Sequence, residues 1–295
     1  MLEARRKHEL VVFAGAGVSM GPPAHLPSLK KFVQDALVGV DLPPQVLTAM
    51  IDYEKRLLRL LDIIHEEVGD ELYRQAQIAY SKDVRPTAFH EAIVRLFDRQ
   101  GPIRIVTTNY DRLLSTAAID YRGDKPAEYT YPTTLPTFLP PLDGIAYLHG
   151  HVKIPYRQLI LRKNDFADAY SGEANAIARR FLADALREVT VVFIGYSMGD
   201  EAVEYFLRSL RQHSQMYALC RYNEANHWLG SGIGPIIYPL HSGVDEYQHL
   251  VDAVKQWSDD APRWAPVPER HKQFSETSDD GSINCDQAAT EDEGL

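Results

Sequence analysis

Two polar side chains follow an apolar run near the middle of the chain and are suited to hold a reacting molecule. The run 103–107 is followed by Asn109 and, two positions later, by Asp111. An amide at the end of a strand can hold a water or a sugar hydroxyl, and a carboxylate can accept a hydrogen bond from a carboxamide. Asp111 can instead serve only as the cap of a helix that begins near Arg112. The spacing favours a binding role for Asn109 and leaves both roles open for Asp111.

A histidine stands at the corresponding place after another apolar run. Residues 144–148 are followed by His149 and Gly150. The ordinary pKa of histidine lies near neutrality, so an imidazole at the end of a strand is suited to act as a general base. The adjacent glycine and the strand-end position favour this interpretation over a structural one. His90 and His151 lack that context, and we assign them to the core or the surface.

Glycine turns follow two further apolar runs. The run 10–13 leads into Gly15-Ala16-Gly17, and the run 190–194 leads into Gly195-Tyr196-Ser197. Because glycine has no side chain, such turns let backbone N–H groups approach a ligand, and phosphate is the usual ligand there. The sequence therefore predicts two phosphate-binding turns, with the Ser197 hydroxyl as an added donor.

The second turn also permits a different interpretation. Gly195, Ser197 and Gly199 have the Gly-x-Ser-x-Gly spacing of the nucleophile elbow of hydrolases, and His241 is available later in the chain as a base. In that case Ser197 is a nucleophile. This alternative leaves Asn109 and His149 without a role, and we rank it below the binding interpretation.

Strands that alternate with helices must position these residues. Strands are predicted over 10–13, 103–107, 144–148 and 190–194, with further candidates over 158–161, 216–219 and 235–238. This alternation predicts an α/β fold with a parallel sheet that is covered by helices on both faces. In such sheets ligands bind outside the carboxyl ends of the strands, where the polar motifs stand.

A helical insert is predicted between the first two strands. Residues 40–99 are almost wholly helical in pattern, with helices over 56–68 and 87–98 after an earlier one over 28–37. The apolar residues of 56–68 cover more than half of that helix. They are typical of a core, and an oligomer contact is the alternative.

Composition sets the remaining limits. The net charge of −10 argues against general nucleic-acid binding, and no apolar run reaches the roughly 20 residues that span a bilayer. Residues 264–295 form a predicted disordered acidic tail after a domain over 1–263. The two cysteines, Cys220 and Cys285, are too few for a four-cysteine zinc site or a disulfide framework. We expect a cytoplasmic protein with no membrane partner.

Taken in order, the four motifs resemble the sirtuin superfamily. The likeness extends from Leu10 to about Gly199, and more weakly to about Trp257. Thr-Asn-Tyr-Asp, and Gly-Tyr-Ser followed by an Asp, are similar to the bacterial sirtuin-like branch found in anti-phage defence. The matching residues are Gly15-Ala16-Gly17-Val18-Ser19, Thr108-Asn109-Tyr110-Asp111, His149-Gly150 and Gly195-Tyr196-Ser197.

This resemblance implies a Rossmann-like sheet that binds NAD+ as a substrate, with no metal. Asn109, His149 and Asp111 are then the catalytic residues, near the nicotinamide and its ribose. The implied cofactor-binding residues are Ala14, Gly15, Ala16, Gly17, Ser19, Thr108, Gly195, Tyr196 and Ser197.

Departures from the family pattern bear on the reaction. Sirtuin deacylases carry two Cys-x-x-Cys pairs of a zinc ribbon between the His-Gly and Gly-Ser motifs, whereas residues 152–194 contain no cysteine. The ribbon that helps to form the acyl-lysine cleft is therefore missing. The glutamine before the catalytic asparagine is replaced by Thr108, and the Pro-Asp-Phe-Arg segment by residues 26–30. These losses lower the expectation of deacylation and leave the chemistry of the glycosidic bond in place.

The expected reaction is hydrolysis of NAD+ to nicotinamide and ADP-ribose. The pyridinium charge weakens the bond to C1′, and cleavage needs a nucleophile placed beneath that carbon. Water is the natural nucleophile, held by Asn109 and deprotonated by or through His149. A zinc-free deacylase and a non-catalytic module that senses NAD+ or ADP-ribose are the alternatives. Unrestrained hydrolysis would harm a cell, so we expect gating by homo-oligomerisation or by a separate ATPase-like or nuclease-like partner.

Overall fold

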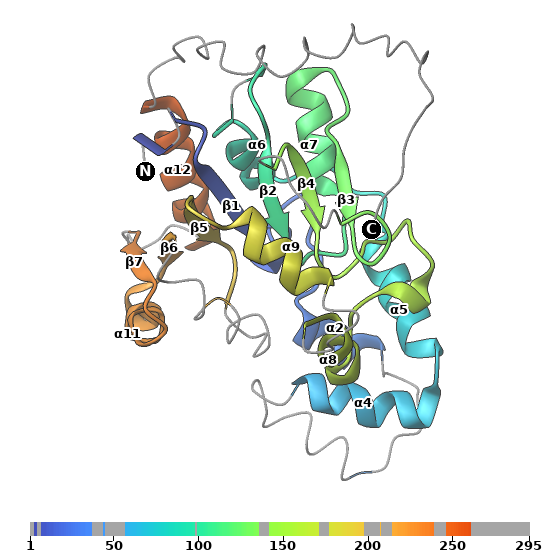
Figure 1. The fold of residues 1–295 in the computed structure, drawn as a ribbon. Helices are drawn as coiled ribbons and strands as arrows, with labels where there is room; N and C mark the ends of the chain where they lie inside the picture. Colours follow the sequence, from blue (N-terminus) through green and yellow to red (C-terminus); the bar gives the residue numbers. More distant parts are fainter. Residues whose placement is uncertain are drawn as a thin grey trace, which may run out of the picture. The chain divides into compact units, whose positions relative to one another are not determined.

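The described part of the chain folds around one seven-stranded sheet (Figure 1). The computed structural model describes residues 3–4, 7–36, 44, 57–97, 99–135, 142–170, 177–197, 207, 214–238 and 246–260. The strand order is β3-β4-β2-β1-β5-β6-β7, and every neighbouring pair is parallel. This is the predicted α/β, Rossmann-like fold. The strands are β1 Leu10–Ala14, β2 Arg104–Thr107, β3 Glu128–Thr130, β4 Gly144–Tyr147, β5 Thr190–Ile194, β6 Gln215–Cys220 and β7 Gly234–Ile237.

The first strand lies in the middle of the sheet and marks its switch point. β1 pairs with β2 on one edge and with β5 on the other. After β1, strands β2, β3 and β4 lie on one side of it in the sheet, and β5, β6 and β7 lie on the other side. Connections leave the sheet in opposite directions around β1, which makes the carboxyl end of this strand the expected place for a ligand.

Alternation along β1 divides the core into two layers. Val11 and Phe13 belong to one apolar cluster, and Leu10 and Val12 belong to another on the opposite face. The first cluster includes residues of α9 (Ile177–Ala185), and the second includes residues of α6 (Ala88–Val94), α7 (Leu113–Arg122) and α12 (Glu246–Asp260). Helices thus cover both faces, as the continuous apolar strands require.

Three helices form a helical unit beside the carboxyl ends of the strands. They are α2 (Leu29–Ala36), α4 (Leu57–Val68) and α5 (Glu71–Tyr80). Leu60, Leu61 and Ile64 of α4 are buried in the cluster of this unit. The apolar residues predicted for 56–68 therefore pack within the chain, which favours a core role for them over an oligomer contact. The same cluster contains Tyr110, Val152, Leu159 and Leu161, which lie in loops that follow strands.

The structure corrects one strand and adds another. Residues 158–161 form no strand: a short 3-10 helix, η3 (Tyr156–Gln158), leads through a loop to α8 (Lys163–Tyr170). The run is apolar because Leu159, Ile160 and Leu161 are buried in that loop. The three-residue strand β3 was not predicted, because it is too short for alternation to show. The remaining elements are η1 (Ala16–Val18), η4 (Tyr222–Glu224) and α11 (Ala225–Gly230).

Within the described ranges, no helix is long and apolar enough to cross a membrane. The predicted acidic tail, 264–295, lies outside the described residues.

Candidate functional site

Asn109 and His149 occupy equivalent positions just beyond the carboxyl ends of two neighbouring strands, β2 and β4. Thr107, the last residue of β2, pairs with Tyr147, the last residue of β4. Asn109 and His149 each follow two positions later, and both are buried, with 6% and 2% of their surface exposed. The parallel sheet therefore brings together the two residues that the sequence singled out for chemistry.

A serine hydroxyl connects Asn109 with Asp111. Ser19, which follows η1 after the central strand, is buried. Its Oγ donates a hydrogen bond to Oδ2 of Asp111 at 2.8 Å and accepts one from Nδ2 of Asn109 at 3.2 Å. The first glycine turn thus contributes to the site through the serine that ends it.

His90 completes this network, although its sequence context assigned it to the core or surface. Its Nε2 lies 3.1 Å from Oγ of Ser19. The backbone N–H of Thr87 donates to Nδ1 at 3.0 Å, so Nδ1 is the bare nitrogen and Nε2 carries the proton. Burial lowers the pKa of His90 to about 3, which keeps the ring neutral. The sequence did carry a signal: a histidine flanked by Phe89 and Ile93 on an apolar helix face needs a buried partner.

With Nδ1 of His90 accepting from the Thr87 N–H, the other protons of the network can be placed. Nε2–H of His90 and Nδ2–H of Asn109 donate to the two lone pairs of the Ser19 oxygen, so the serine proton goes to Asp111. The amide of Asn109 is therefore held in one orientation. Its Oδ1 is buried and has no hydrogen-bond partner among the described residues. A buried acceptor without a partner is costly in a folded protein, and here it marks the place where a ligand hydroxyl or a water can donate.

Asp111 contacts both the start of α7 and the Ser19 hydroxyl, and its role in binding a ligand stays a prediction. Its Oδ1 accepts the backbone N–H of Leu113 at 3.0 Å, at the start of α7, while Oδ2 serves the network. Burial raises the pKa of Asp111, and the hydrogen bonds from Leu113 and Ser19 oppose that shift. The carboxylate is thus both a cap and a part of the candidate site.

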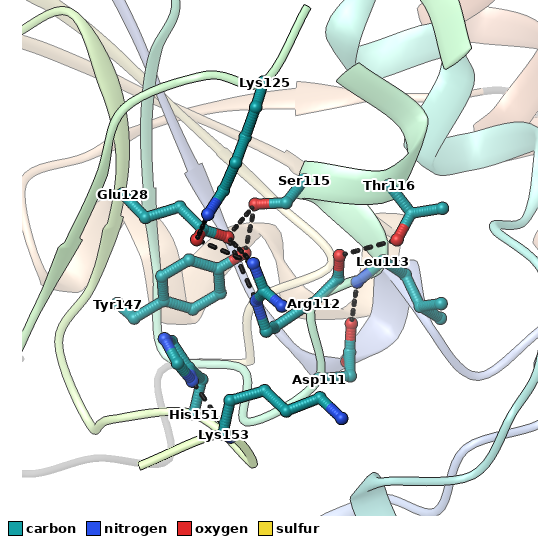
Figure 2. Close-up of polar contacts among 10 residues, drawn as sticks. All are labelled: Asp111, Arg112, Leu113, Ser115, Thr116, Lys125, Glu128, Tyr147, His151 and Lys153. Atoms are coloured by element: carbon teal, nitrogen blue, oxygen red, sulfur yellow. Dashed lines mark hydrogen bonds and ion pairs between the residues drawn. The ribbon is translucent and has the colours of Figure 1, made fainter. Parts of the chain in front are cut away.

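A second polar cluster fixes the segment that follows Asp111 (Figure 2). Arg112 forms a two-pronged ion pair with Glu128 of β3, with N–O distances of 2.6 and 2.7 Å from Nη2. Ser115 donates to Glu128 at 2.6 Å and lies 2.8 Å from the Tyr147 hydroxyl. Arg112 holds the pKa of Glu128 below its ordinary value against the effect of burial. These contacts tie the first turn of α7 to β3 and β4, and so hold Asp111 in place.

His149 is enclosed by aromatic rings of a helix that follows it. Its ring makes edge contacts with Phe166 and Tyr170 of α8, with centroids 4.7 and 6.3 Å apart, and the Tyr170 hydroxyl lies 3.3 Å from Nε2. Burial lowers the pKa of His149 to about 3. His149 therefore does not have the near-neutral pKa that its sequence position predicts. Its imidazole is neutral throughout the physiological pH range and is a weak proton acceptor.

The two glycine turns pack directly against each other. The N–H of Gly15 donates to the carbonyl of Ile194 at 2.9 Å, and the N–H of Gly17 donates to that of Gly195 at 2.8 Å. A Cβ atom on Gly15 would lie 2.6 Å from the carbonyl oxygen of Gly195. These glycines are therefore needed for the close approach of the turns. Since both N–H groups are used within the protein, they do not form the predicted free phosphate cradle.

The other predicted cofactor-binding residues surround these turns. Ala16 and Ser197 are exposed at their tips, and Thr108 is half-buried. The Tyr196 ring packs against Phe13, with centroids 5.1 Å apart. Ala14 is buried, and its carbonyl accepts the hydroxyl of Thr107 and the N–H of Thr108. Gly199 and His241, which belong to the alternative serine-nucleophile site, lie outside the described residues. No group of three or more His, Cys, Asp or Glu side chains able to hold a metal occurs in the described ranges.

Comparison with known proteins identifies the domain. Residues 103–230, from β2 to α11, match the SIR2-like domain family. This part of the chain is similar to SIR2-like domains. The matched range includes Asn109, Asp111 and His149, the three residues predicted to carry the chemistry. The likeness to the sirtuin superfamily is therefore confirmed.

Three curated proteins are also similar to the chain. The NAD(+) hydrolase ThsA of Bacillus cereus is 28% identical over 207 residues, which cover 68% of this chain and 39% of ThsA. The protein of the same name from Cytobacillus dafuensis is 24% identical over 266 residues, covering 86% and 48%. The protein y4cA of Sinorhizobium fredii, whose name assigns no activity, is 26% identical over 300 residues, covering 82% and 23%. The chain thus spans less than half the length of each relative.

Proposed function

We propose that the SIR2-like domain hydrolyses the bond between nicotinamide and ribose in NAD+, giving nicotinamide and ADP-ribose. The observation that carries this proposal is the buried Oδ1 of Asn109, which is held in one orientation and has no partner among the described residues. An acceptor of this kind suits a hydroxyl of the nicotinamide ribose or the attacking water. The names of the two ThsA relatives support the same substrate.

In this reaction the C1′–N1 bond breaks and its electron pair goes to the pyridinium ring, which leaves as neutral nicotinamide. The oxygen of water forms the new bond to C1′ of the oxocarbenium-like centre, and one proton is released to solvent. Asn109 would orient the water or the ribose by accepting a hydrogen bond at Oδ1. Positioning of the two reactants against each other supplies much of the rate in such a step.

His149 would assist without titrating near neutrality, and Asp111 would assist through the charge of its carboxylate. The neutral His149 can accept a hydrogen bond from water or a ribose hydroxyl. If it takes up a proton, the imidazolium, with a pKa of about 3, releases that proton rapidly to solvent. Asp111 adds negative charge beside Asn109, where positive charge develops on the ribose in the transition state. Both roles use the environment that burial creates for these side chains.

Protein deacylation is a second candidate, and the surroundings of His149 disfavour it. The segment between His149 and β5 contains α8, which places Phe166 and Tyr170 against the imidazole. The resemblance to deacylases implies a peptide cleft formed with the help of a zinc ribbon. No cysteine of such a ribbon is present between residues 152 and 194. Water is smaller than an acylated lysine and better suited to this enclosed centre.

We further propose that the hydrolase is a gated effector of anti-phage defence. The resemblance to the bacterial sirtuin-like branch supports this role, and the harm of unrestrained NAD+ loss supports gating. Self-association and a separate partner protein are the two forms of gating to be tested.

The test is an NAD+ consumption assay with the purified full chain over a wide range of protein concentrations. Nicotinamide release should be observed, and Asn109→Ala should reduce its rate by 100-fold or more. Asn226→Ala is the matched control, because Asn226 is exposed on α11. A rate that rises faster than the protein concentration would support gating by self-association.

Three results would count against the proposal. An Asn109→Ala protein that consumes NAD+ at the wild-type rate would remove the role of Oδ1. Calorimetric binding of NAD+ without nicotinamide release at any protein concentration would favour a sensing module. Nicotinamide release that requires an acylated peptide would favour a deacylase.

A further inference from the structure

Helix α8 supplies the immediate surroundings of His149. Phe166 and Tyr170 are four residues apart, so they share one face of this helix, and their rings stack with centroids 6.0 Å apart. Both are buried, and both lie nearly perpendicular to the imidazole, with interplanar angles of 75° and 86°. The imidazole is therefore held in its plane by packing.

Packing alone does not distinguish the two faces of an imidazole. A rotation of the ring by 180° about the Cβ–Cγ bond exchanges the positions of Nδ1 and Cδ2 and those of Nε2 and Cε1. The shape of the ring stays almost the same. Torsions of this kind have broad, two-fold preferences. Only a hydrogen-bond partner separates the two orientations, because one presents a nitrogen where the other presents carbon.

The Tyr170 hydroxyl is that partner. It lies 3.3 Å from Nε2 of His149, and both residues are buried. Among the described residues, no other hydrogen bond to the imidazole is found. Because a neutral imidazole has one N–H and one bare nitrogen, a hydroxyl fixed at Nε2 also influences which nitrogen carries the proton. Nδ1 is then the nitrogen that remains for a ligand.

The helix that carries Tyr170 is itself anchored at its start. Asp165 accepts the backbone N–H groups of Leu161 and Arg162 at 3.0 and 2.9 Å. The hydroxyl of Tyr73, in α5 of the helical unit, donates to the same carboxylate at 2.7 Å. Tyr170 is thus presented by a helix whose first turn is capped and tied to a neighbouring helix, which is the support that a positioning residue needs.

We propose that Tyr170 is a positioning residue for His149: its hydroxyl holds Nε2 and thereby determines which ring nitrogen faces NAD+. This inference rests on the proposed hydrolysis. Tyr170→Phe removes the hydroxyl and keeps the stacked ring, so it should lower kcat about 3- to 10-fold, which is the effect of one buried hydrogen bond. KM for NAD+ should change less than two-fold, and the melting temperature should fall by no more than about 4 °C, the shift expected for one lost buried hydrogen bond in a domain of this size.

The experiment compares Tyr170→Phe with Tyr129→Phe, in which the lost hydroxyl belongs to a half-buried tyrosine of β3 that contacts the carbonyl of Asp143. Rates are combined with ¹⁵N NMR of the imidazole nitrogens, which distinguishes a protonated nitrogen from a bare one. Tyr170→Phe should lower kcat and alter the ¹⁵N signals of His149, while Tyr129→Phe should do neither. In a His149→Ala background, Tyr170→Phe should cause no further loss of rate or of NAD+ affinity.

The outcomes separate this inference from the proposed function. If the wild type releases no nicotinamide, the hydrolase proposal fails, whereas the NMR signals still show whether Tyr170 holds the ring. If the wild type is active and Tyr170→Phe retains both the kcat and the His149 signals of the control, the positioning role is overturned. A further loss in the His149→Ala background would also overturn it, because Tyr170 would then act by another route.

Discussion

Nε2 of His90 lies 3.1 Å from Oγ of Ser19, and this contact joins α6 to the turn after the central strand. The two residues are 71 positions apart in the chain. Through Ser19 the contact reaches Asn109 and Asp111, so a histidine that touches neither of them takes part in fixing both.

Replacement of His90 tests the network from its far end. His90→Leu should lower the NAD+ hydrolysis rate about 10- to 100-fold and destabilise the fold by about 1–3 kcal/mol, because the N–H of Thr87 loses its acceptor. His90→Gln should keep the rate within about 5-fold of the wild type, since glutamine at this helix position can accept from the Thr87 N–H and still offer a donor to Ser19. Thermal unfolding and steady-state kinetics measure both effects. Equal losses in the two variants would contradict the assignment.

Removal of the Ser19 hydroxyl should affect activity more than it affects folding. In Ser19→Ala the Asn109 amide loses its acceptor and Asp111 loses one donor, so the fixed orientation of Oδ1 is lost. We expect a fall in kcat of about 10- to 100-fold and a loss of about 1–2 kcal/mol in the free energy of unfolding. Ser81→Ala is the control, because Ser81 is exposed at the end of α5. A Ser19→Ala enzyme with wild-type kcat would show that Asn109 needs no support from this hydroxyl.

The two buried histidines make stability sensitive to acid. Burial lowers the pKa of His90 and of His149 to about 3, against about 6.5 in an unfolded chain. Between these values the unfolded state binds more protons than the folded state, so stability is complete above pH 6.5 and falls as the pH drops towards 3. Each histidine should contribute a loss of up to about 2 kcal/mol between pH 7 and pH 5.

Chemical denaturation at several pH values measures this slope. The His90→Gln protein should lose less stability than the wild type over the same interval, because one of the two groups is absent. A wild-type stability that is flat from pH 7 to pH 5 would show that the histidines are not held neutral. Between pH 7 and pH 5 the pH–rate profile of the folded enzyme should show no inflection caused by His149. The profile of His149→Gln should therefore have the same shape as that of the wild type.

Close packing of the glycine turns predicts a large effect at one glycine and none at another. The Cβ of Gly15→Ala would lie 2.6 Å from backbone atoms of the second turn, so this change should destabilise the fold by about 2–3 kcal/mol. Gly230→Ala is the matched control, because a Cβ there meets nothing within 4 Å and lies in a helix. That change should be neutral or stabilising by up to about 1 kcal/mol. Comparable melting temperatures for the two variants would refute the packing role of Gly15.

Several features of the protein could be predicted from the residues alone. The apolar runs that end in polar or glycine motifs predicted the parallel sheet, in which the two strands that Asn109 and His149 follow, β2 and β4, are neighbours. These features follow from local patterns, because strand periodicity and chain order fix which residues reach the same edge of a sheet.

Other features depend on how distant elements pack. The partnership of His90 with Ser19 and that of Tyr170 with His149 each require a helix to lie at one particular height and rotation against the sheet, which no local pattern specifies. The glycines of the first turn predict a phosphate-binding turn, whereas the N–H groups of Gly15 and Gly17 donate to carbonyls of Ile194 and Gly195. The pKa of His149 moved far from neutrality because burial removes the solvation of the charged ring, and burial is a property of the folded protein alone.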